Sequence, residues 1–133
     1  MSIVSRKQSA ARFIEGVAAG AIDDRIAVTE FQIWTATSGD MPTSNYRAAI
    51  ASLKHVFKTP LTFEPIRMIA EEKCVAVFLR GTGTLVNDAE YSNDYVFFFE
   101  FDGDRISAVR EYFDTKKVAD VLVPVIRVVR QGV

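Results

Sequence analysis

Apolar and polar positions follow a helical period in the first part of the chain. Between Ser5 and Ala19, the residues Phe13, Ile14 and Val17 fall on one side of a helix. Gly20 follows at the place where glycine commonly ends a helix. The pattern therefore predicts a first helix over this segment.

A short second helix and a strand are expected next. Asp23 or Asp24 can cap a helix that runs through Val28. The segment Glu30–Thr37 is rich in β-favouring residues and predicts a strand. A turn or loop is expected over residues 38–42 because glycine and proline fall there.

A third helix is expected to begin after a cap at Thr43 or Ser44 and to run to about Phe57. Its apolar positions follow the helical period: Tyr46, Ile50, Leu53 and Phe57. The sequence thus places three helices and one strand before residue 58.

The second half of the chain is rich in β-branched and aromatic residues and predicts an antiparallel meander. Four strands are expected, at Leu61–Ala70, Lys73–Val86, Tyr91–Phe101 and Arg105–Phe113. Pro65 is expected to disturb the first of these strands. The run Asp102-Gly103-Asp104 gives the sharpest hairpin signal of the chain.

The chain ends in a predicted helix and an apolar tail. The helix is expected over Lys116–Val123 and should stop at Pro124. The tail over residues 124–133 could form a strand, a lid or a partner contact. Helices gathered before hairpin-linked strands indicate an α+β fold. The length of 133 residues suits one domain over 1–133, with its core at about 5–123.

Composition and charge narrow the classes of function. The net charge is −1 and the basic residues are scattered, so nucleic acid binding is disfavoured. No apolar stretch reaches the ~18 residues of a membrane span, and the first residues do not resemble a signal peptide. A cytoplasmic protein with no membrane partner is expected. Cys74 is the one cysteine, and its apolar surroundings predict a buried, inert thiol.

The usual signatures of metal and nucleophilic catalysis are missing from the sequence. His55 is the one histidine, and a position on a helix surface or core edge is far commoner for such a residue than a catalytic triad. Zinc sites normally use several His or Cys ligands. We therefore expect no metal and no cofactor.

The segment 95–115 carries the most specific information in the sequence. It contains an aromatic strand, an Asp-Gly turn and then Arg110-Glu111-Tyr112-Phe113-Asp114. This pattern resembles the last hairpin of the SnoaL-like branch of the nuclear transport factor 2-like superfamily, which includes ketosteroid isomerases, limonene epoxide hydrolases and polyketide cyclases. The resemblance implies a cone-shaped, strongly bent antiparallel or mixed sheet, wrapped by three amino-terminal helices in a cystatin-like roll. It also implies a small-molecule pocket and a homodimer packed through the convex faces of its sheets.

Strand alternation predicts which side chains share a face with Glu111. Val109, Glu111 and Phe113 share one face of the last strand, and Asn93, Tyr95 and Phe97 share one face of the strand before it. The resemblance places Glu111 where the epoxide hydrolases have a pocket base, and Tyr95 where the ketosteroid isomerases have an oxyanion donor. The catalytic candidates are therefore Glu111 and Tyr95. The expected substrate-binding residues are Asn93, Trp34, Arg80, Phe97, Val109 and Phe113.

The sequence departs from both family patterns in its other catalytic positions. The second carboxylate of the hydrolases would fall at Thr82, and the base of the isomerases would fall near Thr35. Neither threonine can abstract a proton from carbon. Asp40 lies close to Thr35 in sequence, and the direction of its loop is open.

Each candidate also has a purely structural alternative. Glu111 could pair with Arg80 or lie exposed at the sheet edge, because structural ion pairs also perturb pKa values. Tyr95 and Asn93 could satisfy backbone groups, and Trp34 could be plain core. Asp114 is expected to cap the last helix.

Three classes of function stay open from the sequence. The first is acid–base chemistry on an apolar, oxygen-bearing compound, carried out by Glu111 with Tyr95 and Asn93. The second is a domain that binds a ligand or a partner without chemistry. The third is a structural dimerisation module, whose cavity would be filled by side chains.

Overall fold

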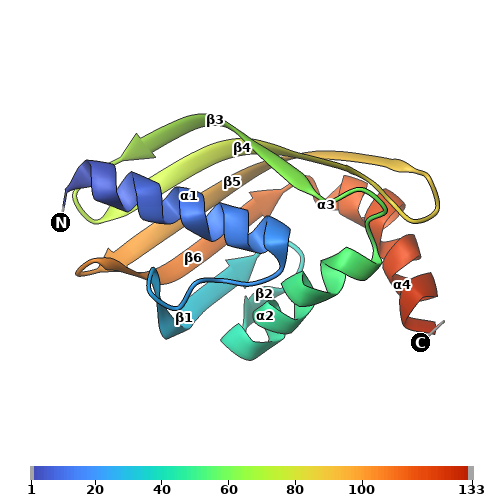
Figure 1. The fold of residues 1–133 in the computed structure, drawn as a ribbon, viewed down its shortest axis with the longest axis horizontal. Helices are drawn as coiled ribbons and strands as arrows, with labels where there is room; N and C mark the ends of the chain where they lie inside the picture. The colour runs from blue at the N-terminus through green and yellow to red at the C-terminus, as the bar shows by residue number, and fades with distance from the viewer. Residues whose placement is uncertain (1, 132–133) are drawn as a thin grey trace.

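Six strands form one curled sheet with the helices gathered in and around its concave side (Figure 1). The computed structural model describes residues 2–131. The strands are β1 (Ala27–Thr35), β2 (Gly39–Met41), β3 (Thr62–Ala70), β4 (Cys74–Thr84), β5 (Glu90–Asp102) and β6 (Arg105–Phe113). The helices are α1 (Ile3–Ala19), α2 (Thr43–Ser52) with a 3₁₀ turn over Leu53–His55, α3 (Thr115–Lys117), a π-helical turn over Val118–Leu122 and α4 (Val123–Gln131).

The strand order β2-β1-β6-β5-β4-β3 makes the sheet mixed. The strands β3 to β6 pair as the antiparallel meander that the sequence predicts. On the other side of β6, β1 pairs with it in parallel, and the short β2 forms the antiparallel edge strand beside β1. The predicted α+β class and the bent mixed sheet are confirmed.

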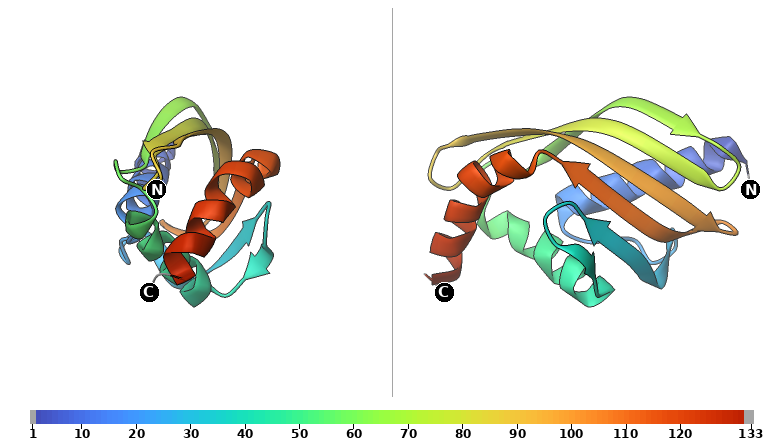
Figure 2. Two further views of the ribbon diagram at one scale, coloured as in Figure 1. Left: turned by 90° about the vertical axis from the view of Figure 1, so that its right-hand side faces the viewer. Right: turned by 180° about the vertical axis from the view of Figure 1, so that it is seen from behind.

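Helix α1 fills the concave side of the sheet with its apolar face (Figure 2). The ring of Phe13 lies 5.4 Å from that of Phe31 on β1 and 5.3 Å from that of Phe99 on β5, edge to face in both cases. Such aromatic pairs stabilise a core beyond the area they bury. The helix ends at Gly20, which adopts a left-handed conformation (φ 86°) as the sequence predicts.

The predicted second helix is not formed. The carboxylate of Asp23 accepts a hydrogen bond from the backbone N–H of Arg25 and pairs with its guanidinium, which stabilises a tight turn. The strand β1 then begins at Ala27, earlier than expected. The three amino-terminal helices of the sequence prediction are therefore two.

The prolines change local structure in two ways. At Pro65 the pairing of β3 with β4 shifts register, as predicted. At Pro124 the helix does not stop: a π-helical turn precedes the proline, and α4 continues beyond it. Proline is compatible with the first turn of a helix, where its missing N–H is not needed, so the expectation of a stop was wrong.

The last helix, α4, crosses the open end of the curled sheet (Figure 2, left). Val125 is buried there, and Ile126 and Val129 pack partly against the core, so the predicted tail forms a helix as far as Gln131. Residues 132 and 133 of that tail lie outside the described residues. Within the part of the chain that the structure describes, no helix is long and apolar enough to cross a membrane.

Candidate functional site

A cavity of about 370 Å³ lies between the concave face of the sheet, α2 and the C-terminal helices. This volume falls in the lower part of the range of small-molecule sites, roughly 300–1,000 Å³. Its wall is mostly apolar, and Glu111 is the one formally charged residue among the described residues that line it. The lining comprises Val17, Thr35, Thr37, Ser38, Met41, Tyr46, Ala49, Ile50, Leu53, Phe57, Leu61, Phe63, Tyr91, Tyr95, Glu111, Phe113, Val118, Leu122, Val123 and Ile126.

Glu111 on β6 places its carboxyl group in this apolar wall. The strand pairing puts it beside Phe97 of β5 and Thr35 of β1, so neighbours on both sides shield it. Only 8% of the residue is exposed, and its Oε2 atom has no hydrogen-bond partner within residues 2–131. The predicted alternative of an ion pair with Arg80 is excluded because Arg80 pairs with Asp94 instead. The alternative of an exposed edge position is excluded because Glu111 is buried on a central strand.

Burial raises the pKa of Glu111 from its ordinary value of 4.5 to about 7. The hydroxyl of Tyr46 acts in the opposite direction and lowers this pKa, although no bond of full hydrogen-bond geometry joins the two groups in the structure. A carboxyl group with a pKa near neutrality is populated in both its acid and its base form at physiological pH.

Two tyrosine hydroxyl groups meet beside this carboxyl group. The Oη atoms of Tyr91 and Tyr95 lie 2.6 Å apart. Burial raises the pKa of both hydroxyls, and the negative charge of Glu111 contributes in the same direction. Both groups therefore stay protonated and can act as hydrogen-bond donors.

Tyr46 lines the cavity from α2, and its hydroxyl oxygen is itself buried. Burial and the charge of Glu111 raise its pKa well above the ordinary value, and its Oη has no hydrogen-bond partner among the described residues. Two polar atoms without a hydrogen-bond partner of full geometry, Tyr46 Oη and Glu111 Oε2, thus belong to residues that line the same cavity, although both atoms are themselves buried. Buried polar groups are nearly always paired, so such a pair of atoms is unusual.

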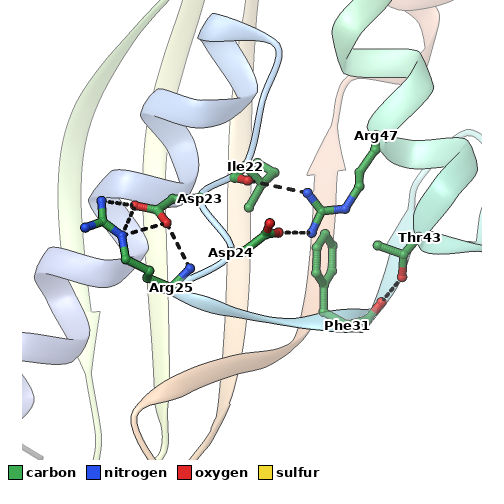
Figure 3. Close-up of polar contacts among 7 residues, drawn as sticks. All are labelled: Ile22, Asp23, Asp24, Arg25, Phe31, Thr43 and Arg47. Atoms are coloured by element: carbon green, nitrogen blue, oxygen red, sulfur yellow. Dashed lines mark hydrogen bonds and ion pairs between the residues drawn. The ribbon is translucent and has the colours of Figure 1, made fainter.

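The position of α2, and hence of Tyr46, is fixed by contacts around it (Figure 3). The hydroxyl of Thr43 donates to the carbonyl oxygen of Phe31 on β1 at 2.6 Å. The guanidinium of Arg47 lies 5.4 Å from the centre of the Phe31 ring, pairs with Asp24 and reaches the carbonyl oxygen of Ile22. These contacts tie both ends of the Tyr46 turn to β1 and to the α1–β1 connection.

Among the predicted site residues, the structure brings Glu111, Tyr95 and Phe113 together at the cavity. Asn93 lies directly behind Tyr91, is 1% exposed and does not line the cavity. Phe97 and Val109 point to the concave face as predicted, but they are sealed in the core. They do not line the cavity, so the structure does not bring them together with Glu111 as a substrate-binding surface.

Trp34 and Arg80 lie on the outer face of the sheet, away from the cavity. Trp34 is in register with Arg110, whose guanidinium carbon sits 4.3 Å from the centre of its ring. Arg80 is half-exposed and forms an ion pair with Asp94 at 2.9 Å. Both were predicted to bind substrate, but strand alternation turns these positions outward, so neither lines the cavity.

The remaining open positions are also placed. Thr35 lines the cavity, where its Oγ1 accepts a hydrogen bond from the backbone N–H of Ser38. Asp40 lies exposed on β2, opposite Trp34, and does not line the cavity. Asp114 caps α3 by accepting from two backbone N–H groups, as predicted.

The sequence analysis missed the roles of Tyr46 and Tyr91. Tyr46 was recognised as a buried position of a helix, and its hydroxyl carried no signal of its own. Tyr91 shares the β5 face with Asn93 and Tyr95 at a spacing of two residues, so strand alternation alone could have found it.

Residues 2–131 contain no group of three or more His, Cys, Asp or Glu side chains arranged to hold a metal ion.

Comparison with known proteins identifies the family of the chain. The family model of the SnoaL-like domain matches residues 10–109. The chain belongs to the SnoaL-like family.

Solved structures share the fold of this SnoaL-like domain at low sequence identity. An NTF2-like protein from Anabaena variabilis is 21% identical, with a TM-score of 0.70 over 83% of this chain and 87% of that one. A Jannaschia protein provisionally described as a SnoaL-like polyketide cyclase is 16% identical, with a TM-score of 0.75 over 90% and 92%. AclR from Streptomyces galilaeus, provisionally described as a hydroxylase, is 15% identical, with a TM-score of 0.74 over 93% and 86%. A search of curated protein sequences gives no match.

Proposed function

We propose that this SnoaL-like protein is a cofactor-independent enzyme that moves a proton on a neutral, apolar, oxygen-bearing molecule. The observation that carries the proposal is the buried carboxyl group of Glu111, a residue in the wall of the cavity, one of whose oxygens has no hydrogen-bond partner among the described residues. A carboxyl group buried without such a partner costs folding stability, and a strongly perturbed carboxyl group in a cleft is typical of functional sites. Isomerisation and cyclisation through an enol are the reaction classes that fit best.

Glu111 would act as the acid–base group. With its pKa raised to about 7 by burial, the carboxylate can take a proton from a carbon beside a carbonyl group, and the acid form can return it to another carbon. A single carboxyl group suffices for this sequence, because the proton that it removes is also the one that it returns. The threonines at positions 35 and 82 offer no second base, which speaks against epoxide hydrolysis by a carboxylate pair.

The tyrosine hydroxyls would stabilise the negative charge that develops on the substrate oxygen. Tyr95 lies on the strand next to Glu111, and Tyr46 belongs to the wall of the cavity on α2. Donors placed in advance in an apolar site stabilise an oxyanion far better than water does. An absence of cationic side chains among the described lining residues favours a neutral substrate over a carboxylate.

The experiment is to follow hydrogen–deuterium exchange at the carbon beside the carbonyl of small apolar ketones by NMR. The wild-type protein should catalyse exchange, and Glu111→Gln should reduce the rate by at least roughly 100-fold, the usual contribution of one general base. Glu100→Gln is the matched control, since Glu100 lies exposed on the neighbouring strand. Equal exchange rates in wild type and Glu111→Gln would refute the role of Glu111.

The second candidate is a domain that binds a ligand without chemistry. The threonines in place of the second carboxylate and of the first-strand base favour it. It predicts a ligand that remains chemically unchanged and exchange rates that match those of free solution. Isothermal titration with ketones that show no exchange would separate this function from catalysis.

We also propose that the protein forms a homodimer through the outer face of the sheet. Phe78 and Val96 are paired across β4 and β5 on that face, and Tyr112 lies next to Val96 on β6. All three are exposed. Nearby charges of both signs, such as Arg80 and Asp94, suit a face that meets its own copy about a two-fold axis.

A further inference from the structure

The amide of Asn93 has one fixed orientation in the interior. Its Oδ1 accepts from the backbone N–H of Asp114 at 3.1 Å, and its Nδ2 donates to the carbonyl oxygen of the same residue at 3.0 Å. A backbone N–H can only donate and a carbonyl can only accept, so the reverse placement of the amide oxygen and nitrogen would break both bonds.

This orientation decides what the amide offers to Tyr91. The second hydrogen of Nδ2 points to Tyr91 Oη at a distance of 3.0 Å. Tyr91 therefore accepts from Asn93, and its own proton still needs an acceptor. The Oη of Tyr95, 2.6 Å away, is the acceptor at hand.

We propose that Asn93 is a positioning residue, which orders the hydroxyls so that Asn93 donates to Tyr91, Tyr91 donates to Tyr95, and Tyr95 presents its free proton to a ligand oxygen. The proposal rests on the proposed function, because it assigns the donor that meets the substrate. In this order the two Nδ2 protons of Asn93 and the hydroxyl proton of Tyr91 each have an acceptor in the protein. Only the hydroxyl proton of Tyr95 is left for a ligand. Hydrogen bonds in such a chain polarise one another, which strengthens the last donor.

Both hydroxyls keep their protons in the interior, as this order requires. Burial raises the pKa of Tyr91, although its hydrogen bonds with Tyr95 and Asn93 act in the opposite direction. Burial also raises the pKa of Tyr95.

The same amide also anchors the wall of the cavity. Asp114 ends β6 and begins the C-terminal helices, and its carboxylate caps α3. Phe113 before it and Val118, Leu122 and Ile126 after it line the cavity. Asn93 thus holds the hydroxyl pair and the C-terminal wall in one geometry.

The order of the hydroxyls is tested first by NMR on the ligand-free protein with labelled tyrosine. A proton held between two oxygens 2.6 Å apart should give a downfield, slowly exchanging resonance. We expect this proton to correlate with the ring carbons of Tyr91. A correlation with the ring carbons of Tyr95 would overturn the proposal, whatever the protein binds.

The effect on a ligand is tested with 4-nitrophenol, whose bound phenol and phenolate forms differ in absorbance. Tyr91→Phe keeps the bonds between Asn93 and Asp114 but breaks the relay, so it should shift the ionisation of the bound probe toward the phenol by roughly tenfold, the equivalent of one hydrogen bond. Asn93→Leu should shift it in the same direction. Asn45→Leu, on the exposed surface of α2, should leave it unchanged.

Amide hydrogen exchange separates positioning from a merely structural role. Asn93→Leu should speed exchange in residues 115–131, whereas Tyr91→Phe should not. If Asn93→Leu speeds exchange there and neither variant shifts the ionisation of the probe, Asn93 acts on the wall alone and the proposal fails. If wild-type protein binds no nitrophenol, the proposed function is contradicted, and the NMR correlation still decides the order of the hydroxyls.

Discussion

Glu111 carries its carboxyl group in an apolar wall, where ionisation costs folding free energy. The folded protein keeps a proton on this group up to a pKa of about 7, whereas the unfolded chain releases it near the ordinary value of 4.5. The protein therefore loses stability as the pH rises through this window. A group retained at such a cost is typical of functional sites.

The first prediction concerns the stability of Glu111→Gln. The difference between the two pKa values corresponds to about 3 kcal/mol, present in full below pH 4.5 and lost as the pH rises through 7. Glutamine cannot ionise, so the variant should be more stable than wild type at pH 8 by up to this amount, with a smaller difference at pH 5. Urea unfolding at both pH values measures it.

The control for this prediction is Glu100→Gln, which removes an exposed carboxylate from the neighbouring strand. It should change the free energy of unfolding by no more than ~0.5 kcal/mol at either pH, as exposed substitutions usually do. If the difference in unfolding free energy between wild type and Glu111→Gln is the same at pH 5 and pH 8, Glu111 has an ordinary pKa and the prediction is contradicted.

At the scale of the element, β4 positions Tyr95 through a missing side chain. A Cβ atom at Gly81 would lie 2.9 Å from carbon atoms of both the Phe63 and the Tyr95 rings. These two rings lie edge to face at 5.3 Å across the strand. The glycine therefore leaves the space into which the Tyr95 ring packs.

Gly81→Ala should displace the Tyr95 ring and destabilise the protein by ~1–3 kcal/mol, as other cases of overpacking do. Gly81→Ala should weaken ligand binding more than Tyr95→Phe does, because it displaces the whole Tyr95 ring and Tyr95→Phe removes only the hydroxyl group. Thr82→Ala, at the next and exposed position of β4, is the matched control and should do neither. Thermal unfolding and probe titration check both variants, and a Gly81→Ala protein with wild-type values would contradict the assignment.

The C-terminal helices depend on one cap. Asp114 accepts from the backbone N–H groups of Lys116 and Lys117, at the start of the segment that closes the cavity. Asp114→Ala should cost ~1 kcal/mol of local stability, the typical value of a helix cap. Amide exchange in residues 118–131 should then rise.

The comparison variant for the cap is Asp120→Ala, which removes an exposed ion pair with Lys116 on the same segment. Exposed pairs of this spacing contribute only ~0.3–0.5 kcal/mol. Faster exchange in Asp120→Ala than in Asp114→Ala would show that the ion pair, not the cap, holds the segment.

The strands and the inward direction of β5 and β6 could be predicted from the sequence because alternation is local. β6 is found at its predicted bounds, and Glu111, Tyr95 and Phe113 face the cavity as expected. Alternation predicts which face of the sheet a residue lies on, but not how far along the strand the cavity extends. Phe97 and Val109 were therefore predicted to line the cavity, although they lie buried in the core. Tyr46 could not be found, because its role depends on how α2 packs across the sheet.

At the scale of the whole molecule, the outer face of the sheet stays without a covering layer in the single chain. Phe78 is 44% exposed and Tyr112 is 40% exposed at the centre of this face. The ring of Trp34 lies tilted against that of Tyr112, at 4.9 Å between ring centres, and adds a third aromatic side chain. Contiguous exposed apolar surface on a sheet is typical of an interface.

We expect the wild-type protein to sediment as a dimer and Phe78→Glu to sediment as a monomer. A charge buried at the centre of an interface costs enough free energy to raise the dissociation constant by at least roughly 100-fold. Val128→Glu provides the control, because Val128 is even more exposed, at 68%, but lies on α4 away from the outer face. It should remain dimeric. If Phe78→Glu keeps the mass of the wild-type dimer while Val128→Glu dissociates, the subunits meet through the C-terminal helices, and the cavity mouth, not the back of the sheet, faces the partner.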